Sequence, residues 1–276
     1  MSVDDDDLID HLADAAREAG EAILIVVRRG FEIESKSDAS PVTEADHAAE
    51  LVILAALARA APGVPVIAEE EVAAGRIPAH DDLYFLVDPL DGTKEFVRGG
   101  DDYTVNIGLI EGGEPRLGVV FAPATGRLHA GRVGLGAWVD EGAGPRAIHT
   151  RERGEQVTAV ASRSHFNQAT ADYLEAAVGT CAQVSIGSSL KFCIVAEGAA
   201  DIYPRPSPTS EWDTAAGHAV LLAAGGLVDA PDGTPLRYGK RAFVNRGFVA
   251  TGGWKAPRLA PFIEPFAGGG DLPEGV

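Results

Sequence analysis

The sequence predicts a layered α/β protein made of two lobes with a cleft between them. Two helical patterns open the chain, and a series of short apolar runs follows them, as expected for a sheet packed under helices. After about residue 145 the pattern changes to strands and helices in alternation. The 276 residues, with 46% hydrophobic content, are enough to bury a sizeable core.

The first half is expected to contain two helices and then strands. Apolar residues recur at helical spacing over residues 8–27, behind four aspartates that suit the positive end of a helix. After a polar turn region, a second helix is expected from residue 43 until Pro62 and Gly63 stop it. Apolar runs typical of strands and hairpins then occupy residues 64–70, 83–89, 104–110, 116–123 and 131–144.

The second half is expected to alternate strands with helices. The expected strands lie at residues 157–165, 182–187 and 201–205. The expected helices lie at residues 167–178, 188–200 and 211–226, and short strands close the chain. We therefore expect an N-terminal α+β lobe at residues 1–147 and a C-terminal α/β lobe at residues 148–276.

Composition excludes several classes of function. The formal net charge is −18 and the pI is about 4.7, so the surface repels nucleic acids and anionic membranes. The acidic N-terminus is unlike a signal or transit peptide, and no apolar run is as long as a membrane span. Cys181 and Cys193 form no CxxC pair, and we interpret them as small buried apolar residues. We expect a cytoplasmic protein; peripheral association with the inner membrane, and the choice between monomer and homodimer, stay open.

The stretch LVDPLDGTKEF contains the first candidate metal site. Its apolar run is typical of a strand buried on both faces, and Pro89 is expected to end the pairing because it has no N–H. Asp91 and Gly92 are typical of a turn, so Asp88 and Asp91 can face one point with the Leu90 carbonyl between them. Three hard oxygen donors suit Mg²⁺. The alternative is an Asx-type turn that only ends a strand.

Other acidic residues also end apolar runs or open helices. Glu69, Glu70 and Glu71 follow an apolar run, where a surface charge run is the ordinary explanation. Asp213 follows a tryptophan at an apparent helix start, where an N-cap is the alternative. Asp46 stands in a T-x-x-D pattern that matches a capping box. Each alternative is reasonable alone, but four such acidic sites together favour a metal centre.

These motifs resemble the two signatures of the inositol monophosphatase superfamily of lithium-sensitive, Mg²⁺-dependent phosphatases. The first signature is carried by DPLDGTKEF and the following GGDDYTVNIGLI, and the second by EWDTAAGHAVLLAAGG. With ASRSH and GSSLKFCIVAEGAADIYPR, they are most similar to the CysQ branch of 3′(2′),5′-bisphosphate nucleotidases. The likeness runs from about residue 8 to about residue 252. It implies the two-lobed, alternating αβαβα sandwich of the inositol monophosphatase and fructose bisphosphatase type.

The resemblance also implies a role for each acidic motif. Two or three Mg²⁺ ions would be held by Glu69, Asp88, the Leu90 carbonyl, Asp91 and Asp213. Such ions would reverse the local field for a dianionic phosphate ester.

The catalytic set implied by the resemblance is Asp46, Thr93 and Glu69. Thr93 and Asp46 would position or deprotonate the attacking water, and the amides of Gly92 and Thr93 would face the phosphate. No covalent phosphoenzyme is required. The sequence has no P-loop, which argues against an NTPase.

Basic residues near the cleft would then decide which phosphate ester binds. The implied substrate contacts, besides Gly92 and Thr93, are Lys94, Arg163, His165, Ser188, Lys191, Arg205 and Asp213. Lys191 is the strongest candidate, because it lies in an otherwise apolar helix just after a Gly-Ser-Ser turn that suits an anion. For each of these cations the alternative is a surface charge or a salt bridge, and His165 has the further alternative of an ordinary loop histidine.

The first functional hypothesis is hydrolysis of adenosine 3′,5′-bisphosphate (PAP), and also of its sulfated form PAPS, in the recycling of nucleotides from sulfate assimilation. The nearest rivals act on inositol monophosphate, fructose bisphosphate or histidinol phosphate. Those branches usually have DGTxNF, whereas this chain has Lys94 and Glu95 between DGT and Phe96, which favours the nucleotidase. A non-catalytic protein that binds metal or anions is the remote alternative, because every ligand of the motif is present.

Overall fold

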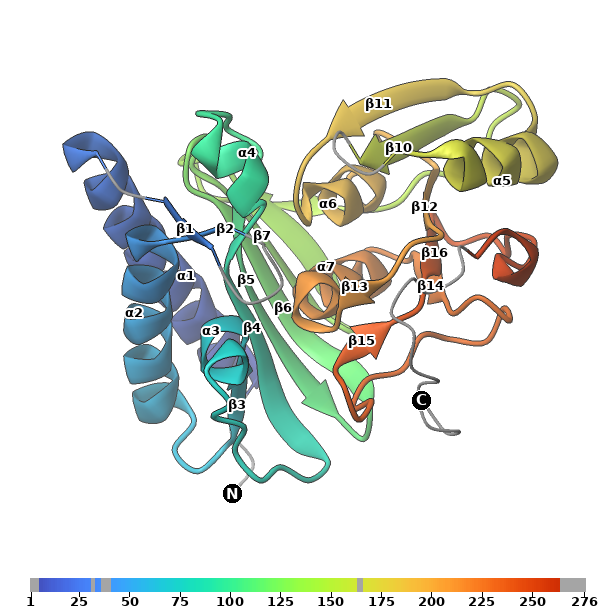
Figure 1. The fold of residues 1–276 in the computed structure, drawn as a ribbon. Coiled ribbons are helices and arrows are strands. Elements are labelled where there is room, and N and C mark those ends of the chain that lie inside the picture. Colours follow the sequence, from blue (N-terminus) through green and yellow to red (C-terminus); the bar gives the residue numbers. More distant parts are fainter. Residues whose placement is uncertain (1–4, 31–32, 36–40, 163–165, 264–276) are drawn as a thin grey trace.

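The computed structural model describes residues 5–30, 33–35, 41–162 and 166–263. These residues form layers in the order helix, sheet, helix, sheet, helix (Figure 1). One outer layer holds α1 (Asp5–Arg29) and α2 (Glu44–Ala60), and the other holds α5 (Gln168–Val178). The central layer holds α6 (Leu190–Ala196) and α7 (Trp212–Ala223), which lie between the sheets. The predicted αβαβα sandwich is confirmed.

The two sheets differ in strand direction. Among the described residues the larger sheet is antiparallel except for one parallel pair, and its strands in order are β3 (Val66–Ala68), β4 (Leu83–Asp91), β5 (Thr104–Glu111), β6 (Glu114–Ala122), β7 (Arg127–Arg132), β8 (Gly136–Asp140) and β9 (Pro145–Ile148). The smaller sheet is mixed, and its strands in order are β11 (Ala182–Ile186), β10 (Thr158–Ser162), β12 (Ile202–Arg205), β16 (Phe248–Thr251) and β14 (Leu227–Asp229).

Short elements complete the described part of the chain. They are the pairs β1 (Ile33–Ser35) with β2 (Pro41–Thr43) and β13 (Thr209–Ser210) with β15 (Val244–Asn245), and the helices α3 (Glu69–Ala73), α4 (Thr93–Val97) and η1 (Ala260–Phe262). The long helices and most of the main strands lie where the sequence predicts them, whereas β7, β9, α3 and α4 were not predicted. No helix within the described ranges has the length and apolar composition needed to cross a bilayer.

The proposed division at residues 147 and 148 falls at the end of the larger sheet. Its last strand ends at Ile148, and the first strand of the smaller sheet begins at Thr158. Helices α6 and α7 come from the second half but pack against the larger sheet as well as the smaller one. The two halves therefore share the core between the sheets, and the boundary stays a proposal.

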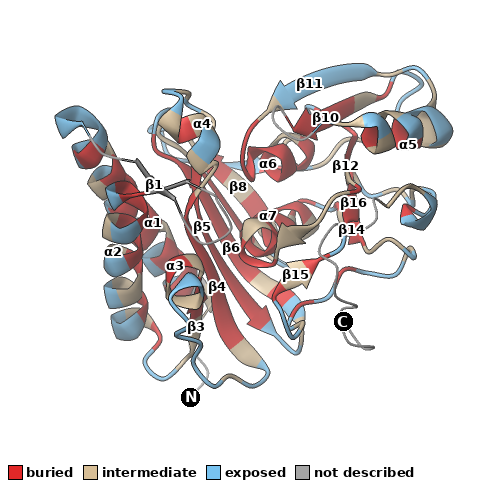
Figure 2. Cartoon of the chain, viewed as in Figure 1, coloured by how far each residue is buried: buried red, intermediate tan, exposed pale blue. Residues whose placement is uncertain are grey.

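A row of glycines brings α7 close to the larger sheet. Gly108, Gly118 and Gly131 lie side by side on β5, β6 and β7. A Cβ at Gly118 would lie 2.3 Å from the carbonyl oxygen of Ala216, and one at Gly131 would lie 2.7 Å from Val220 Cα. Because glycine has no side chain, the backbone of α7 packs directly against these strands. The three glycines and the face of α7 that covers them are buried (Figure 2).

Candidate active site

The DPLDGT stretch forms a bulge at the end of β4. Asp88 pairs with Asn106 and Asp91 pairs with Thr104, so the register shifts between the two aspartates. The expectation that pairing stops at Pro89 is wrong, because the ladder skips the proline and resumes at Asp91. The Asx-type turn is also present, since the Leu90 N–H donates to Asp88 Oδ1 at 3.0 Å. The bulge thus contains the Asx-type turn and also leaves Asp88 and Asp91 lining the same cleft.

Three predicted ligands converge from segments that are far apart in the sequence. One carboxylate oxygen from each of Glu69, Asp88 and Asp213 lies within 4.8 Å of the other two. Glu69 begins α3, Asp88 lies on β4 and Asp213 lies in the first turn of α7. Leu90 and Asp91 line the same cleft beside this cluster.

The electrostatics of the cluster fit a divalent cation. Burial, together with the nearby negative charges of Asp91 and Glu69, raises the pKa of Asp213 to about 7. Carboxylates held this close repel one another unless a cation lies between them. Hard oxygen donors in such a group are the ligands that Mg²⁺ prefers.

Asp213 is held by the chain just before α7. Its Oδ2 accepts hydrogen bonds from the Ser210 N–H at 3.0 Å and from the Thr209 hydroxyl. The N-cap position of α7 is Glu211, so the N-cap alternative for Asp213 is wrong. The Glu211 side chain is fully buried and accepts hydrogen bonds from the Gly239 and Lys240 N–H groups.

The three consecutive glutamates have different environments. Glu69 faces the cleft, while Glu70 is buried and its N–H donates to Glu50 Oε2 at 3.0 Å. Glu71 pairs with Arg76 at the surface. The surface-charge alternative therefore holds for Glu71 alone. Burial raises the pKa of the Glu50 carboxyl to about 7.

Asp46 and Thr93 lie together, as predicted. Asp46 Oδ2 accepts from the Thr43 N–H at 2.7 Å and from the Thr43 hydroxyl at 2.8 Å, which completes the capping box of α2. Thr93 Oγ1 lies 3.4 Å from Asp46 Oδ1 and 3.1 Å from the Leu90 carbonyl oxygen. The threonine hydroxyl thus links Asp46 to the ligand segment.

The backbone turns sharply at Gly92, where α4 begins. Its φ of 93° lies in the left-handed region, and a Cβ there would be 2.8 Å from the Asp102 carbonyl oxygen. Gly187 approaches the same residue, and its N–H donates to Asp102 Oδ2 at 3.1 Å. The turn after β4 and the turn before α6 can both lie close to Asp102 because Gly92 and Gly187 have no side chain.

Two of the predicted cations lie in the wall of the cleft. Lys191 is buried, its Nζ donates to the Ser188 carbonyl oxygen at 2.5 Å, and it lies 5.4 Å from the centre of the Tyr203 ring. Burial lowers the pKa of Lys191 to about 8. Arg205 lines the same wall, and its Nε is buried with no hydrogen-bond partner among the described residues.

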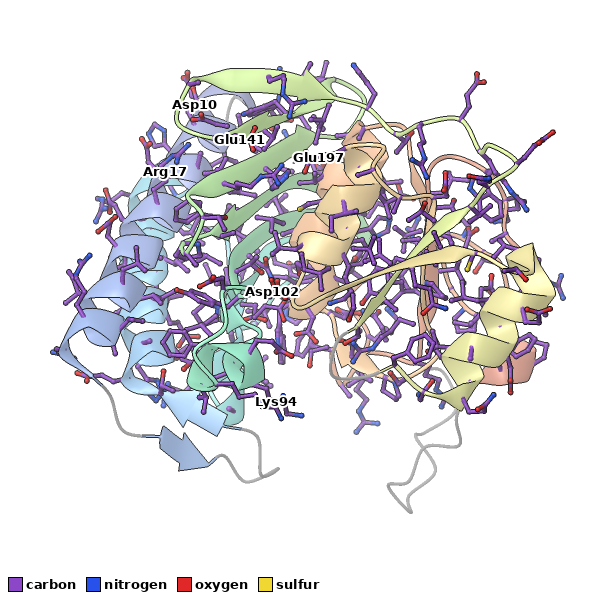
Figure 3. The ribbon with its side chains drawn as sticks, turned by 90° about the horizontal axis from the view of Figure 1, so that it is seen from above. Asp10, Arg17, Lys94, Asp102, Glu141 and Glu197 are labelled. Carbon is purple, nitrogen blue, oxygen red and sulfur yellow. The ribbon has the colours of Figure 1, made fainter. Side chains whose placement is uncertain are left out.

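Of the remaining candidate substrate contacts, the structure describes the positions of two. Ser188 lines the cleft with φ of 48°, and this left-handed turn places its carbonyl against Lys191. Lys94 is exposed at the rim, on the outer side of α4 (Figure 3). Arg163 and His165 lie outside the described residues.

Sequence reasoning missed residues that support the ligands from behind. Glu50 holds the start of α3, while Asn106 and Ser189 hydrogen bond to Asp91. The sequence contains a feature that could have identified two of these residues. Glu50 follows Asp46 by one helical turn, and Asn106 is a lone amide in an apolar strand.

The layered sandwich with an acidic cleft defines a class of protein, the divalent-metal phosphatases. A family model described as the inositol monophosphatase family matches residues 4–261. The chain belongs to the inositol monophosphatase family, whose enzymes use divalent metals, and it is a phosphatase of that family.

Within this family, the chain is similar to several individual proteins over most of its length. It is 45% identical over 244 residues to the 3′(2′),5′-bisphosphate nucleotidase CysQ of Shigella flexneri, covering 87% of this chain and 98% of that protein. The crystal structure of CysQ from Bacteroides thetaiotaomicron is similar with a TM-score of 0.75 and 36% identity, over 89% of this chain and 97% of that one. A histidinol-phosphatase of Mycobacterium tuberculosis is 36% identical over 258 residues, 90% of this chain and 96% of that protein.

Proposed function

We propose that this chain is a Mg²⁺-dependent 3′(2′),5′-bisphosphate nucleotidase that removes the 3′(2′)-phosphate of PAP and also accepts PAPS. One observation carries the proposal: a carboxylate cluster and a buried lysine line the same cleft. The cluster suits the cations that a phosphate ester needs, and the lysine suits a second anionic group. Similarity to enzymes named CysQ supports the same substrate class.

Two or three Mg²⁺ ions would be held by Glu69, Asp88, the Leu90 carbonyl, Asp91 and Asp213. When bound, they supply charge neutralisation for the phosphate and a lowered pKa for water. Without a cation, the pKa of about 7 for Asp213 leaves this carboxyl partly protonated near neutral pH. The family's use of divalent metals is therefore consistent with the charge of the site.

Thr93 and Asp46 would handle the proton of the attacking water. The Thr93 hydroxyl has one hydrogen and lies near two acceptors, Asp46 Oδ1 and the Leu90 carbonyl oxygen. If this hydrogen is donated to Asp46, the hydroxyl oxygen can accept the water's proton while the carboxylate takes the threonine proton. Asp46 is kept in place for this by the capping box with Thr43.

Lys191 and Arg205 would bind the second phosphate of the nucleotide. Lys191 has little freedom to move, because its stem is buried and its Nζ is held by the Ser188 carbonyl. Arg205 has a buried Nε that lacks a partner in the described part of the chain, so an anion would satisfy it. Arginine can grip a phosphate with two parallel hydrogen bonds.

The test is phosphate release from a panel of esters with Mg²⁺ and with excess EDTA. The panel contains PAP, PAPS, inositol 1-phosphate, fructose 1,6-bisphosphate and histidinol phosphate. We expect the highest kcat/KM on PAP and no release with EDTA. A higher kcat/KM on histidinol phosphate would replace the nucleotidase with the function of the Mycobacterium tuberculosis relative. No release from any ester would leave only a metal-binding or anion-binding role.

A further inference from the structure

A buried polar pair lies behind Asp91, where the two halves of the chain meet. Asn106 comes from β5 of the larger sheet and has no exposed surface, while Ser189 directly precedes α6 and is 2% exposed. Asn106 Nδ2 donates to Ser189 Oγ at 2.9 Å and to Asp91 Oδ2 at 3.3 Å. We call these two residues the Asn106–Ser189 pair.

The serine hydroxyl has one hydrogen and two acceptors within reach. Ser189 Oγ lies 2.9 Å from Asp91 Oδ2 and 2.7 Å from the carbonyl oxygen of Asp213. It can therefore donate its single hydrogen either to the Asp91 carboxylate or to the Asp213 backbone carbonyl, and both residues are predicted ligands. Asp91 lies at the end of the larger sheet and Asp213 in α7, so a single hydroxyl joins two layers of the molecule.

The amide orientation of Asn106 shows which interaction the site favours. Both N–H groups of Asn106 point to oxygen atoms, whereas its Oδ1 is buried without a hydrogen-bond partner in the described residues. An unsatisfied buried acceptor costs about 1–3 kcal/mol, so such a group calls for an explanation. A flipped amide would turn Oδ1 toward the Asp91 carboxylate and repel it. The observed orientation thus places one amide N–H against Asp91 and the other against the Ser189 hydroxyl, and it leaves Oδ1 unsatisfied.

We infer that the Asn106–Ser189 pair is a positioning device that aims Asp91 at the bound cation and couples cation binding to the placement of Lys191. The coupling follows from the chain path, because Ser189 lies two residues before Lys191 and next to the Ser188 carbonyl that holds its Nζ. A shift of Asp91 must move Ser189, and with it the first turn of α6. The inference rests on the proposed function, in which Asp91 binds the cation.

The first test measures cation binding without turnover. Binding of Mn²⁺, a spectroscopic substitute for Mg²⁺, is followed by electron paramagnetic resonance in the wild type, Ser189→Ala and Asn106→Ser. Loss of a residue that orients a metal ligand typically costs about 10–100-fold in metal affinity, so we expect a rise of that size in the Mn²⁺ Kd for both variants. The matched control is Thr104→Val on the same strand, whose buried hydroxyl has no partner among the described residues. Its Mn²⁺ Kd should stay within about twofold of the wild type.

The second test measures the coupling. Adenosine 5′-monophosphate, the proposed product, keeps the phosphate that Lys191 would bind. It should tighten Mn²⁺ binding in the wild type and have a smaller effect in Ser189→Ala, because coupling between two sites is reciprocal.

The outcomes separate the inference from the proposed function. A wild type that binds no Mn²⁺ overturns the proposed function itself. A wild type that binds Mn²⁺, with Ser189→Ala and Asn106→Ser binding it within twofold as tightly, overturns the positioning role. An equal effect of the nucleotide in the wild type and in Ser189→Ala overturns the coupling. Urea unfolding of each variant shows that a change in Kd comes from a folded protein.

Discussion

Single acidic residues in and beside this cleft combine a structural position with a candidate functional one. Asp46 completes the capping box of α2 through Oδ2 and faces Thr93 through Oδ1. Asp88 closes an Asx-type turn and also belongs to the carboxylate cluster. At these positions a carboxylate can cap a helix or close a turn and can also take part in the proposed metal centre. A substitution that tests the chemistry must leave the local structure intact.

Thr93→Val removes the hydroxyl and keeps the shape of the side chain. If Thr93 relays the water's proton, kcat should fall by about 10²–10⁴-fold, the usual contribution of general acid–base catalysis. Its Mn²⁺ Kd should be unchanged, because the Leu90 carbonyl and the carboxylates remain. Steady-state kinetics with PAP and a metal titration check this, with Thr93→Ser as the control that keeps the hydroxyl. Weaker Mn²⁺ binding in Thr93→Val would instead assign the hydroxyl to the metal site.

Lys191→Met keeps the long side chain in its buried place and removes the charge. A hydrogen bond to a charged group contributes about 1.5–3 kcal/mol, so kcat/KM for PAP should fall by roughly 10–100-fold. Release from inositol 1-phosphate, which lacks a second phosphate, should change much less. The matched control is Lys255→Met, whose lysine does not line this cleft and pairs with Asp229. Equal losses on both esters for Lys191→Met would show that the lysine does not select the second phosphate.

At the scale of elements, the position of Asp213 depends on how closely α7 lies on the larger sheet. The helix crosses the row of Gly108, Gly118 and Gly131, and Asp213 lies in its first turn. The opposite face of α7 is covered by α6 and the smaller sheet. The helix is therefore held from both sides, and a change in its distance from the strands must move the ligand.

Gly118→Ala tests this contact. The added Cβ would lie 2.3 Å from the backbone oxygen of Ala216, and overpacking of this kind typically costs about 1–3 kcal/mol. We expect a lower free energy of unfolding by that amount and a higher Mn²⁺ Kd, measured by urea unfolding and metal titration. Gly154→Ala is the control, since nothing lies within 4 Å of a Cβ there, and it should change stability by less than about 0.5 kcal/mol. A Gly118→Ala variant as stable as this control would contradict the close packing of α7.

The sequence predicts most of the main elements and candidate ligands that the fold brings to one cleft, for physical reasons. Long amphipathic helices and apolar strands are local patterns, and candidate metal ligands such as Asp88 and Asp91 are limited to a few residue types in one contiguous motif. The resumption of β4 after Pro89 was missed because a bulge looks like a strand end in sequence. Asn106 and Ser189 were missed because they are 83 residues apart and act only through a contact made by folding.

At the scale of the whole molecule, a partly buried ionic cluster holds the two halves together away from the cleft. Arg127 and His129 on β7 both contact Glu197 at the end of α6, at 2.8 Å each. Figure 3 shows Glu197 and Asp102 at separate places along the boundary between the halves. Burial alone would lower the pKa of His129, but Cys193 and Glu197 outweigh it and raise the pKa to about 9. A pKa in this range predicts a protonated imidazole in the folded protein at neutral pH.

This cluster predicts a loss of stability at alkaline pH. The pKa of His129 is about 9 when folded and about 6.5 when unfolded, so the stabilisation is complete below pH 6.5 and disappears as the pH rises through 9. A shift of this size corresponds to about 3 kcal/mol for a side chain that is 1% exposed. Other buried groups also titrate in this range, among them Lys191 and Glu50, so the quantity to measure is the difference between the wild type and His129→Gln.

Urea unfolding of both proteins at pH 6.5, 8 and 9.5 gives that difference. The wild type should be the more stable protein at pH 6.5, and its advantage over His129→Gln should fall by about 3 kcal/mol toward pH 9.5, because glutamine does not titrate. Parallel curves over this range would show that His129 is neutral in the folded protein. In that case the arginines Arg127 and Arg146 would carry the charge that binds Glu197 across the two halves.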